Sequence, residues 1–225
     1  MSAAALAAAI KDVTQPGLFW GVARIGETAT LYATEEQAIS KAIPSRRAEF
    51  VAGRLAARRA LAALGQPEIA IPMATDRTPV WPDGCVGSLS HANGWAVAVA
   101  GAAHRFIGLG VDLEPADPLD RDVIAIVADE TELAGQTDRS LAARRVFGAK
   151  EAVFKAQYPS TGAMFGFDAV RINLSTHRAI FSDHPEALIV PRSWRRAVLR
   201  VDQSHDHGWI LSVCAVSVGS LKKYG

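Results

Sequence analysis

Three acidic and two amine side chains are spaced in this chain as a site for a metal and a phosphate group would require. Glu151 lies between Lys150 and Lys155 in an otherwise apolar, helix-like run. Further upstream, Asp112 and Glu114 stand two positions apart in a strand-like run. Carboxylate oxygens suit a hard divalent cation, and ammonium groups neutralise phosphate oxygens. The set indicates phosphoryl-transfer chemistry at a pyrophosphate.

The spacing of each acid predicts which way its side chain points. In a strand, Asp112 and Glu114 share one face, about 6.6 Å apart along the chain, and the apolar residues between and before them face the core. In a helix, Glu151 and Lys155 lie one turn apart on one stripe. The alternatives are an exposed strand with two surface acids and an ordinary surface ion pair on the helix.

An arginine-rich helix is predicted over residues 45–64. At roughly 100° per residue, Arg47, Arg54 and Arg58 fall on one line inside the arc of bulky apolar residues, with alanines on the opposite side. Arginines in such an arc need a buried anion, because unpaired charge away from water is costly. A phosphate held by guanidinium groups is one candidate, and an internal Asp or Glu is the other.

Two further segments carry candidate phosphate ligands. Ser90 and His91 end a predicted strand, where the imidazole could donate to a phosphate oxygen or simply lie at the surface of a hairpin. A Ser-His nucleophilic pair is not expected, because adjacent strand residues point to opposite faces. Arg77 lies in the irregular, Pro- and Gly-rich connection 66–84 and precedes Thr78 and Pro79.

Several elements must position these residues. We expect an irregular connection at 66–84, a tight turn at Asn93-Gly94, helices at 45–64, 121–134 and 139–157, and strands at 18–33, 86–90, 95–100, 106–113, 170–174, 187–190, 194–201 and 209–218. This order predicts an α+β fold with two similar α/β halves, residues 1–105 and 106–225. Two loosely similar Trp-led strands, 95–100 and 209–216, also favour a repeat.

Bulk properties exclude several classes of protein. The 225 residues have a net charge of +1, which argues against a dedicated nucleic-acid binder. The only two cysteines, Cys85 and Cys214, are far apart and have no ligand-like spacing. The Ala-rich start lacks the basic region of a signal peptide, and no apolar run reaches the length of a membrane span. We expect a cytoplasmic, monomeric protein.

Three motifs together resemble the 4′-phosphopantetheinyl transferase superfamily. They are the runs 88–91 (Ser-Leu-Ser-His), 108–114 (Gly-Leu-Gly-Val-Asp-Leu-Glu) and 147–155 (Phe-Gly-Ala-Lys-Glu-Ala-Val-Phe-Lys). The runs 46–54 and 155–159 resemble the subgroup of enterobactin-synthase component D. The resemblance spans roughly residues 45 to 170. The chain length resembles the pseudo-dimeric, surfactin-synthetase-type class, whose active site lies at the interface of the two halves.

The resemblance implies a reaction and a set of partners. Coenzyme A would donate its 4′-phosphopantetheine arm to a serine of an apo acyl- or peptidyl-carrier protein, with release of 3′,5′-ADP. The carrier would serve siderophore, polyketide or nonribosomal peptide biosynthesis. The reaction would depend on Mg²⁺ or Mn²⁺.

The resemblance also implies roles for individual residues. The metal would be held by Asp112, Glu114 and Glu151, and catalysis would rest on Glu151, Lys155 and Asp112. Glu151, or a metal-bound water near it, would help to deprotonate the serine. Coenzyme A would contact Arg47, Arg54, Arg77, Ser90, His91, Lys150 and Lys155. One departure concerns Arg77, because Thr78 stands where the family commonly has glycine.

Two other functions fit the same residues. A coenzyme A- or nucleotide-binding module without transfer activity would keep the ligand contacts and lose the metal chemistry. The presence of all three acids argues against this reading. A metal-dependent phosphodiesterase would hydrolyse its substrate with the same acids. The acceptor distinguishes these functions, since only a transferase adds mass to a carrier protein.

Overall fold

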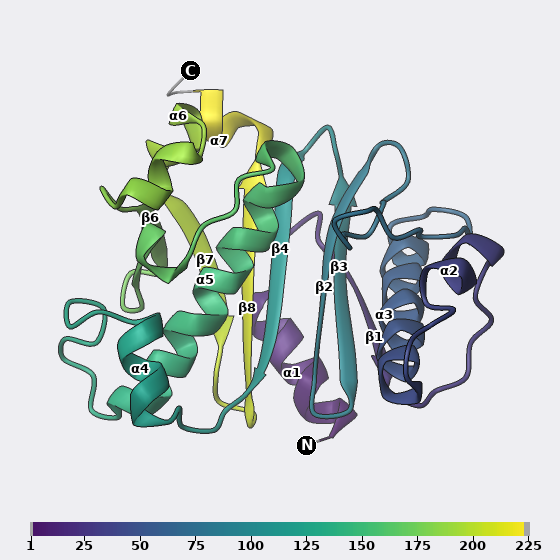
Figure 1. The fold of residues 1–225 in the computed structure, drawn as a ribbon, viewed down its shortest axis with the longest axis horizontal. Coiled ribbons are helices and arrows are strands. Elements are labelled where there is room, and N and C mark those ends of the chain that lie inside the picture. The colour runs from purple at the N-terminus through teal and green to yellow at the C-terminus, as the bar shows by residue number, and fades with distance from the viewer. Residues whose placement is uncertain (1, 223–225) are drawn as a thin grey trace.

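The computed structural model describes residues 2–222, which form two antiparallel sheets. The first sheet has the order β1-β3-β2, with β1 at Phe19–Arg24, β2 at Cys85–Ala92 and β3 at Trp95–Ala102. The second has the order β4-β8-β7-β6-β5, formed by Phe106–Pro115, Trp209–Ser217, Leu199–Ser204, Arg178–Phe181 and Val170–Asn173. Strands β2 and β4 lie side by side where the sheets meet (Figure 1). The predicted mixed α+β fold is confirmed.

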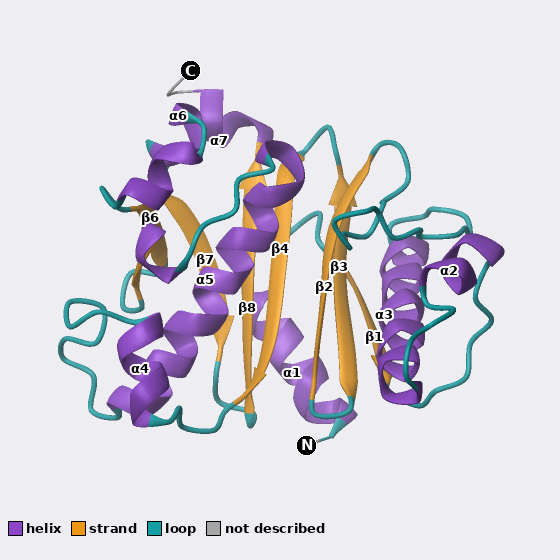
Figure 2. Ribbon diagram, in the orientation of Figure 1, coloured by secondary structure: helices purple, strands orange, loops and turns teal. Residues whose placement is uncertain are grey.

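Two long helices cover the sheets, α3 the first and α5 the second (Figure 2). Helix α3 spans Pro44–Ala63 and begins with the proline that favours a first helical turn. Helix α5 spans Arg139–Thr161, begins at the Asp138 cap and ends at Gly162, whose φ of 65° is left-handed. The shorter helices are α1 (Ala3–Val13), α2 (Ala33–Ala38), α4 (Arg121–Val127), α6 (Arg192–Arg195) and α7 (Val218–Lys222), with 3-10 turns at Phe167–Ala169 and Pro185–Ile189. Among residues 2–222, no helix is both long and apolar enough to cross a membrane.

Glycines allow each long helix to touch the strand beneath it. A Cβ on Gly21 of β1 would lie 2.0 Å from the carbonyl oxygen of Ala56 in α3. A Cβ on Gly110 of β4 would lie 1.8 Å from the carbonyl oxygen of Ala152 in α5. The strand pairs β1-β3 and β4-β8 are both antiparallel. These matching contacts support the prediction of two similar halves, while the boundary at residue 105 and the active site at their interface stay predictions.

The buried face of α3 differs from the predicted one. Its alanines, including Ala52, Ala56 and Ala60, are fully buried against the first sheet. Arg47, expected in a buried arc, is well exposed. The prediction gave bulky side chains too much weight, because a close helix-sheet contact at Gly21 leaves room only for small residues. Arg54 and Arg58 are buried as expected.

Other differences lie mainly in the C-terminal part. The expected strand at 187–190 is mostly a 3-10 turn that ends at Ile189, and Leu188 and Ile189 are exposed while Ala187 and Val190 are buried. The expected strand at 194–201 begins as helix α6 and continues as β7. The helix expected at 121–134 ends at Val127, because Asp129 accepts hydrogen bonds from the N–H groups of Thr131 and Glu132 in a turn. Of the segment 18–33 only β1 is a strand, and the sequence reasoning missed α1 and β6.

Candidate functional site

Three of the predicted residues meet at Asp112 on β4. The Lys155 Nζ of α5 donates to Asp112 Oδ1 over 2.6 Å, and the Ser90 Oγ of β2 donates to the same oxygen over 3.0 Å. Lys155 also donates to the carbonyl oxygen of Val111. Asp112 is only 4% exposed, and its Oδ2 is buried without a hydrogen-bond partner among residues 2–222. A buried carboxylate oxygen without a partner is costly, so this atom is suited to a ligand.

The local sequence explains how Asp112 and its neighbours are placed. Leu109, Val111 and Leu113 of β4 are buried in the core shared with α1, which leaves Asp112 and Glu114 on the opposite face, as predicted, and that face meets α5. Gly148 of α5 lies across from Asp112. A Cβ at Gly148 would lie 3.4 Å from Asp112 Oδ2 and 3.1 Å from the hydroxyl of Ser212. This poor helix former therefore keeps space open beside the unpartnered oxygen.

The negative charge of Asp112 affects the pKa of the other two acids, Glu151 and Glu114. Burial raises the pKa of Glu151, and the charge of Asp112 raises it further while Lys155 opposes the shift. Burial also raises the pKa of Glu114, as does Asp112, and Arg144 opposes that shift. The Arg144 guanidinium donates to Glu114 Oε2 over 2.9 Å. A cation near Asp112 would relieve the repulsion at all three carboxylates.

The predicted trio of acids is not gathered into a ready-made metal site. Within residues 2–222, no three His, Cys, Asp or Glu side chains come close enough together to hold an ion. The unpartnered Oδ2 of Asp112 and the carboxylate of Glu151 fit a hard cation that takes one or two protein carboxylates and substrate oxygens. Glu114 fits less well, since Arg144 already holds its carboxylate. The predicted metal ligands stay predictions.

A group of basic side chains, separate from Lys155, lies near the start of α3. The Arg46 guanidinium lies 3.4 Å from Nε2 of His91, and both lie near the Glu49 carboxylate. Burial lowers the pKa of His91, and Glu49 opposes this shift. Arg47 instead points to Glu36 of α2 and donates to both of its carboxylate oxygens. The structure thus places Arg46, which the sequence reasoning missed, beside His91 and turns Arg47 away.

Arg54 of α3 is buried, and its hydrogen-bonding groups are poorly satisfied. Its side chain is buried over the Phe50 ring, and one long hydrogen bond of 3.4 Å reaches the carbonyl oxygen of Pro72. Its Nε has no hydrogen-bond partner in the part of the chain that the structure describes. Burial lowers the pKa of Arg54 to about 10, against the favourable charge of Glu35. A guanidinium held this way lacks an anion, which a phosphate would supply.

Two other basic residues have internal partners. Arg58 donates to both carboxylate oxygens of Glu35, so the internal acid, and not a phosphate, is its anion. Lys150, a predicted coenzyme A contact, donates to Glu132 over 2.8 Å and to the carbonyl oxygen of Val127. Because this buried pair occupies the ammonium, we do not assign Lys150 to the phosphates.

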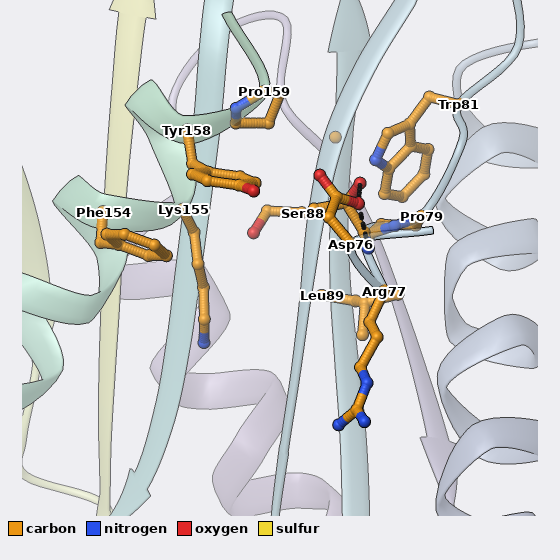
Figure 3. A pocket seen from close by; sticks show the side chains of 12 residues that line it. Asp76, Arg77, Pro79, Trp81, Ser88, Leu89, Phe154, Lys155, Tyr158 and Pro159 are labelled. Carbon is orange, nitrogen blue, oxygen red and sulfur yellow. Dashed lines mark hydrogen bonds between the residues drawn. The ribbon is translucent and has the colours of Figure 1, made fainter. Parts of the chain in front are cut away.

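One pocket, of about 230 Å³, opens between helix α5 and the segment 76–89 (Figure 3). Its walls are the segment 76–81 on one side and α5 on the other, with Ser88 and Leu89 of β2 between them. Tyr158 stacks on Phe154, with ring centroids 5.4 Å apart, and faces Asp76. Lys155 also lines this pocket. We call it the first pocket.

Arg77 lies at the tip of the segment 76–81 that lines the first pocket. Its φ of 71° is left-handed, a conformation that favours glycine. The position that suits glycine is therefore Arg77 and not, as expected, Thr78. The side chains of Arg77 and Lys155 extend toward the same end of the pocket (Figure 3).

A second pocket, of about 260 Å³, lies next to Glu151. Phe154 lines both pockets, and the other walls of this one come mainly from residues 164–167 and Val170. Its lining is Lys150, Glu151, Phe154, Met164, Phe165, Gly166, Phe167 and Val170. The sequence reasoning missed this pocket. The only signal was the aromatic run at 165–167, which is equally typical of a core segment.

Comparisons with known proteins match both halves of the chain. A family model described as the 4′-phosphopantetheinyl transferase N-terminal domain matches residues 34–101, and one described as the 4′-phosphopantetheinyl transferase superfamily matches residues 108–214. The chain is 38% identical over 149 residues to 4′-phosphopantetheinyl transferase Npt of Nocardia iowensis, covering 65% of this chain and 67% of that protein.

Two further relatives extend this picture. The chain is 37% identical over 172 residues to 4′-phosphopantetheinyl transferase Svp of Streptomyces mobaraensis, covering 72% of this chain and 67% of the relative. It is also 37% identical over 136 residues to enterobactin synthase component D of Salmonella typhi, covering 56% of this chain and 54% of that protein.

Proposed function

Because this chain belongs to the 4′-phosphopantetheinyl transferase superfamily, we propose that it transfers the 4′-phosphopantetheine arm of coenzyme A to a serine of an apo acyl- or peptidyl-carrier protein. The serine oxygen forms a bond to the phosphorus that carries the pantetheine arm. The pyrophosphate bond breaks, and 3′,5′-ADP leaves. The observation that carries the proposal is the buried, unpartnered Oδ2 of Asp112 beside Lys155 and Ser90.

The two pockets suit the two ends of coenzyme A. The first pocket offers the stacked Tyr158 and Phe154 rings to the adenine, and its Arg77 supplies positive charge. Arg46 and Arg54 are the cations for the 3′-phosphate, and His91 would join them when its imidazole is protonated. The second pocket is apolar and adjoins Glu151, which suits the pantetheine arm. Lys155 lines the first pocket and contacts Asp112, so the pyrophosphate would lie there.

The acids and Lys155 supply the remaining chemistry. Mg²⁺, held by Asp112 and Glu151, would neutralise charge on the pyrophosphate when bound. The ammonium of Lys155, which donates to Asp112 Oδ1, would also bind a phosphate oxygen. Glu151, or a metal-bound water near it, would accept the serine proton, and the pKa of Glu151 is raised by burial in the metal-free protein. Glu114 orients Arg144 and adds negative charge near Asp112.

The direct test is to incubate the protein with coenzyme A, Mg²⁺ and an apo-carrier protein and then to weigh the carrier. A gain equal to one phosphopantetheine group, with release of 3′,5′-ADP, is expected. Consumption of coenzyme A without a gain in carrier mass would indicate a phosphodiesterase. No change in either would indicate a binding module.

Replacing Arg54 by alanine should raise the KM for coenzyme A by about 10–100-fold, because the 3′-phosphate loses a charged hydrogen bond from the guanidinium. The KM for dephospho-coenzyme A, which lacks that phosphate, should change little. Steady-state kinetics with both donors measure the difference.

Arg47→Ala is the matched control for this prediction, because Arg47 lies on the same helix but is exposed and paired with Glu36. It should leave both KM values near those of the wild type, whereas Arg46→Ala should behave like Arg54→Ala. Equal effects of Arg54→Ala on both donors would contradict a 3′-phosphate contact.

Coenzyme A affinity should rise as the pH falls, through the titration of His91. Burial lowers the pKa of His91 in the free protein, and a bound phosphate favours the imidazolium and raises that pKa. Affinity therefore increases from the pKa of the complex down to the lower pKa of the free protein, and is constant below it. Calorimetric titration without a carrier protein measures this dependence.

His91→Asn separates this effect from the titration of the phosphate itself, whose second pKa is about 6. In the variant, the part of the pH dependence of affinity that comes from the phosphate should remain, and the part that comes from the imidazole should be lost. If wild type and variant show the same pH dependence of affinity, His91 does not contact the phosphate.

A further inference from the structure

A buried ion pair stands at the same place in each half of the molecule. In the first half, both carboxylate oxygens of Glu35 lie 2.9 Å from the guanidinium of Arg58. Glu35 also accepts the N–H of Tyr32 over 2.9 Å and the N–H of Ile71 over 2.8 Å. Arg58 makes one more hydrogen bond, to the carbonyl oxygen of Thr30. Both charged side chains are buried.

The second half has a corresponding arrangement, with a lysine in place of the arginine. Glu132 accepts from the ammonium of Lys150 over 2.8 Å, from the N–H of Asp129 over 3.0 Å and from the N–H of Ile172 over 2.7 Å. Lys150 makes one more hydrogen bond, to the carbonyl oxygen of Val127. This pair is buried as well.

The two sets correspond in every partner. Each acid accepts the N–H three residues before it, and each basic residue comes from the long helix and binds the carbonyl oxygen five residues before the acid. Each acid also accepts the N–H of an isoleucine that follows the helix. Each pair therefore ties together the turn before a long helix, the helix itself and the segment after it.

The first pair fixes the base of the segment that lines the first pocket. Ile71 begins a small hairpin in which Val80 donates to the carbonyl oxygen of Pro72 and Met73 bridges Pro79. The turn of this hairpin and the arm that returns from it form one wall of the first pocket, with Asp76, Arg77, Thr78, Pro79 and Trp81. The hydrogen bond from Ile71 to Glu35 thus sets where that wall stands relative to α3.

The second pair fixes the two walls of the second pocket. Lys150 directly precedes Glu151 on α5, and both line this pocket. Ile172 lies two residues after Val170 on the same buried face of β5, and Val170 lines the opposite wall. The bonds from Lys150 and Ile172 to Glu132 thus set the distance from α5 to β5 across the pocket.

We propose that these are two equivalent positioning pairs, Glu35–Arg58 for the nucleotide end of coenzyme A and Glu132–Lys150 for its pantetheine end. The inference rests on the proposed function, because it assigns one end of that donor to each pocket. Stability alone does not require an ion pair at either place, since buried pairs can often be replaced by apolar residues of similar volume without loss. What an apolar pair cannot supply is the directed bond to the isoleucine N–H.

The two pairs serve as matched controls for each other, because they have the same partners and similar burial. One double variant, Glu132→Leu with Lys150→Met, removes the second pair without leaving a buried charge. The other, Glu35→Leu with Arg58→Met, removes the first. Thermal unfolding shows that each variant is folded at the assay temperature. If a double variant does not fold, the single isosteric change Glu132→Gln or Glu35→Gln takes its place.

Two measurements separate the ends of the donor. The first is the Kd of adenosine 3′,5′-bisphosphate, which has the nucleotide and lacks the pantetheine arm. The second is kcat/KM for transfer from coenzyme A to an apo-carrier protein. Loss of the second pair should lower kcat/KM by about 10²-fold, the cost of a displacement of about 1 Å, and leave the Kd of the bisphosphate unchanged. Loss of the first pair should weaken binding of the bisphosphate by at least tenfold.

The conservative exchanges Lys150→Arg and Arg58→Lys keep the charge and should restore most of each loss. The proposal is overturned if both double variants change both readouts equally, if neither changes either, or if the effects are exchanged between the pairs. A wild-type protein that adds no mass to the carrier but binds the bisphosphate would overturn the proposed function instead, and the bisphosphate arm would still test the first pair.

Discussion

Replacing Asp112 by alanine is expected to lower the rate of phosphopantetheine transfer by at least about 10²–10³-fold, the usual cost of one charge-stabilising group in such a site. Asp112 is where strand β4, helix α5 and strand β2 meet, through the hydrogen bonds from Lys155 and Ser90. Its second oxygen has no hydrogen-bond partner among the described residues. Removing it takes away the proposed metal ligand and the anion that orients Lys155. Carrier-protein mass and 3′,5′-ADP release, followed over time, measure the rate.

Two variants control for folding. Asp112→Asn keeps the shape of the side chain and should lose nearly as much activity as Asp112→Ala, with a melting temperature near that of the wild type. Asp202→Asn changes a carboxylate on β7 that is paired with Arg200, outside the proposed site, and should leave the rate unchanged. Near-normal activity of Asp112→Ala would remove this aspartate from the metal site.

Gly110→Ala is expected to give the largest loss of stability among single methyl additions. The new Cβ would lie 1.8 Å from the carbonyl oxygen of Ala152 and 2.6 Å from the backbone nitrogen of Ala156. Both atoms belong to the backbone of α5, so the whole helix must move. Overpacking in a core costs about 1–3 kcal/mol, and a backbone clash should reach or exceed the upper end. Urea-induced unfolding measures the free energy.

Gly53→Ala is the matched control for this change. Gly53 is also a buried glycine at a helix-sheet contact, but its Cβ would meet only a side-chain carbon of Leu89 at 3.7 Å. This substitution should stabilise α3 by up to about 1 kcal/mol, because alanine is the better helix former. A Gly110→Ala variant as stable as the wild type would mean that α5 does not approach β4 as closely as described.

Elements with a clear period were predictable from the sequence. The alternation in β4 placed Leu109, Val111 and Leu113 in the core and turned Asp112 and Glu114 to the opposite face. The helices α3 and α5 were also predicted, α3 from its proline and glycine bounds, whereas α5 continues beyond the predicted end at 157 through Pro159 to Thr161. Local rules decide these features, because period and capping depend on residues close in sequence.

The placement of the arginines was not predictable in the same way. Helical spacing says which residues share a face, and the packing partner decides which face is buried. Because Gly21 lets the sheet approach α3 closely, the alanine face is buried, so Arg47 is exposed and Arg46 lies beside His91. The partners of Arg58 and Lys150 are distant in sequence, so spacing alone could not identify them.

The sequence alone could not explain why a glycine stands at position 148 inside α5, and the structure supplies the reason. A glycine inside α5 costs helix stability, and nothing in the local pattern accounts for it. The reason is the carboxylate of Asp112 on a strand far away in the chain, which a methyl group at position 148 would crowd. Likewise, the aromatic residues 165–167 gave no sign that they line a pocket next to Glu151.

The most direct test of the central claim is to count Mn²⁺ ions bound to the protein by electron paramagnetic resonance, with and without coenzyme A. We predict one bound ion per chain in the presence of coenzyme A, and its loss in both Asp112→Asn and Glu151→Gln, while Asp202→Asn binds the ion normally. No bound ion with coenzyme A present, or binding that persists unchanged in both variants, would contradict the proposal that these two carboxylates hold a metal beside the pyrophosphate.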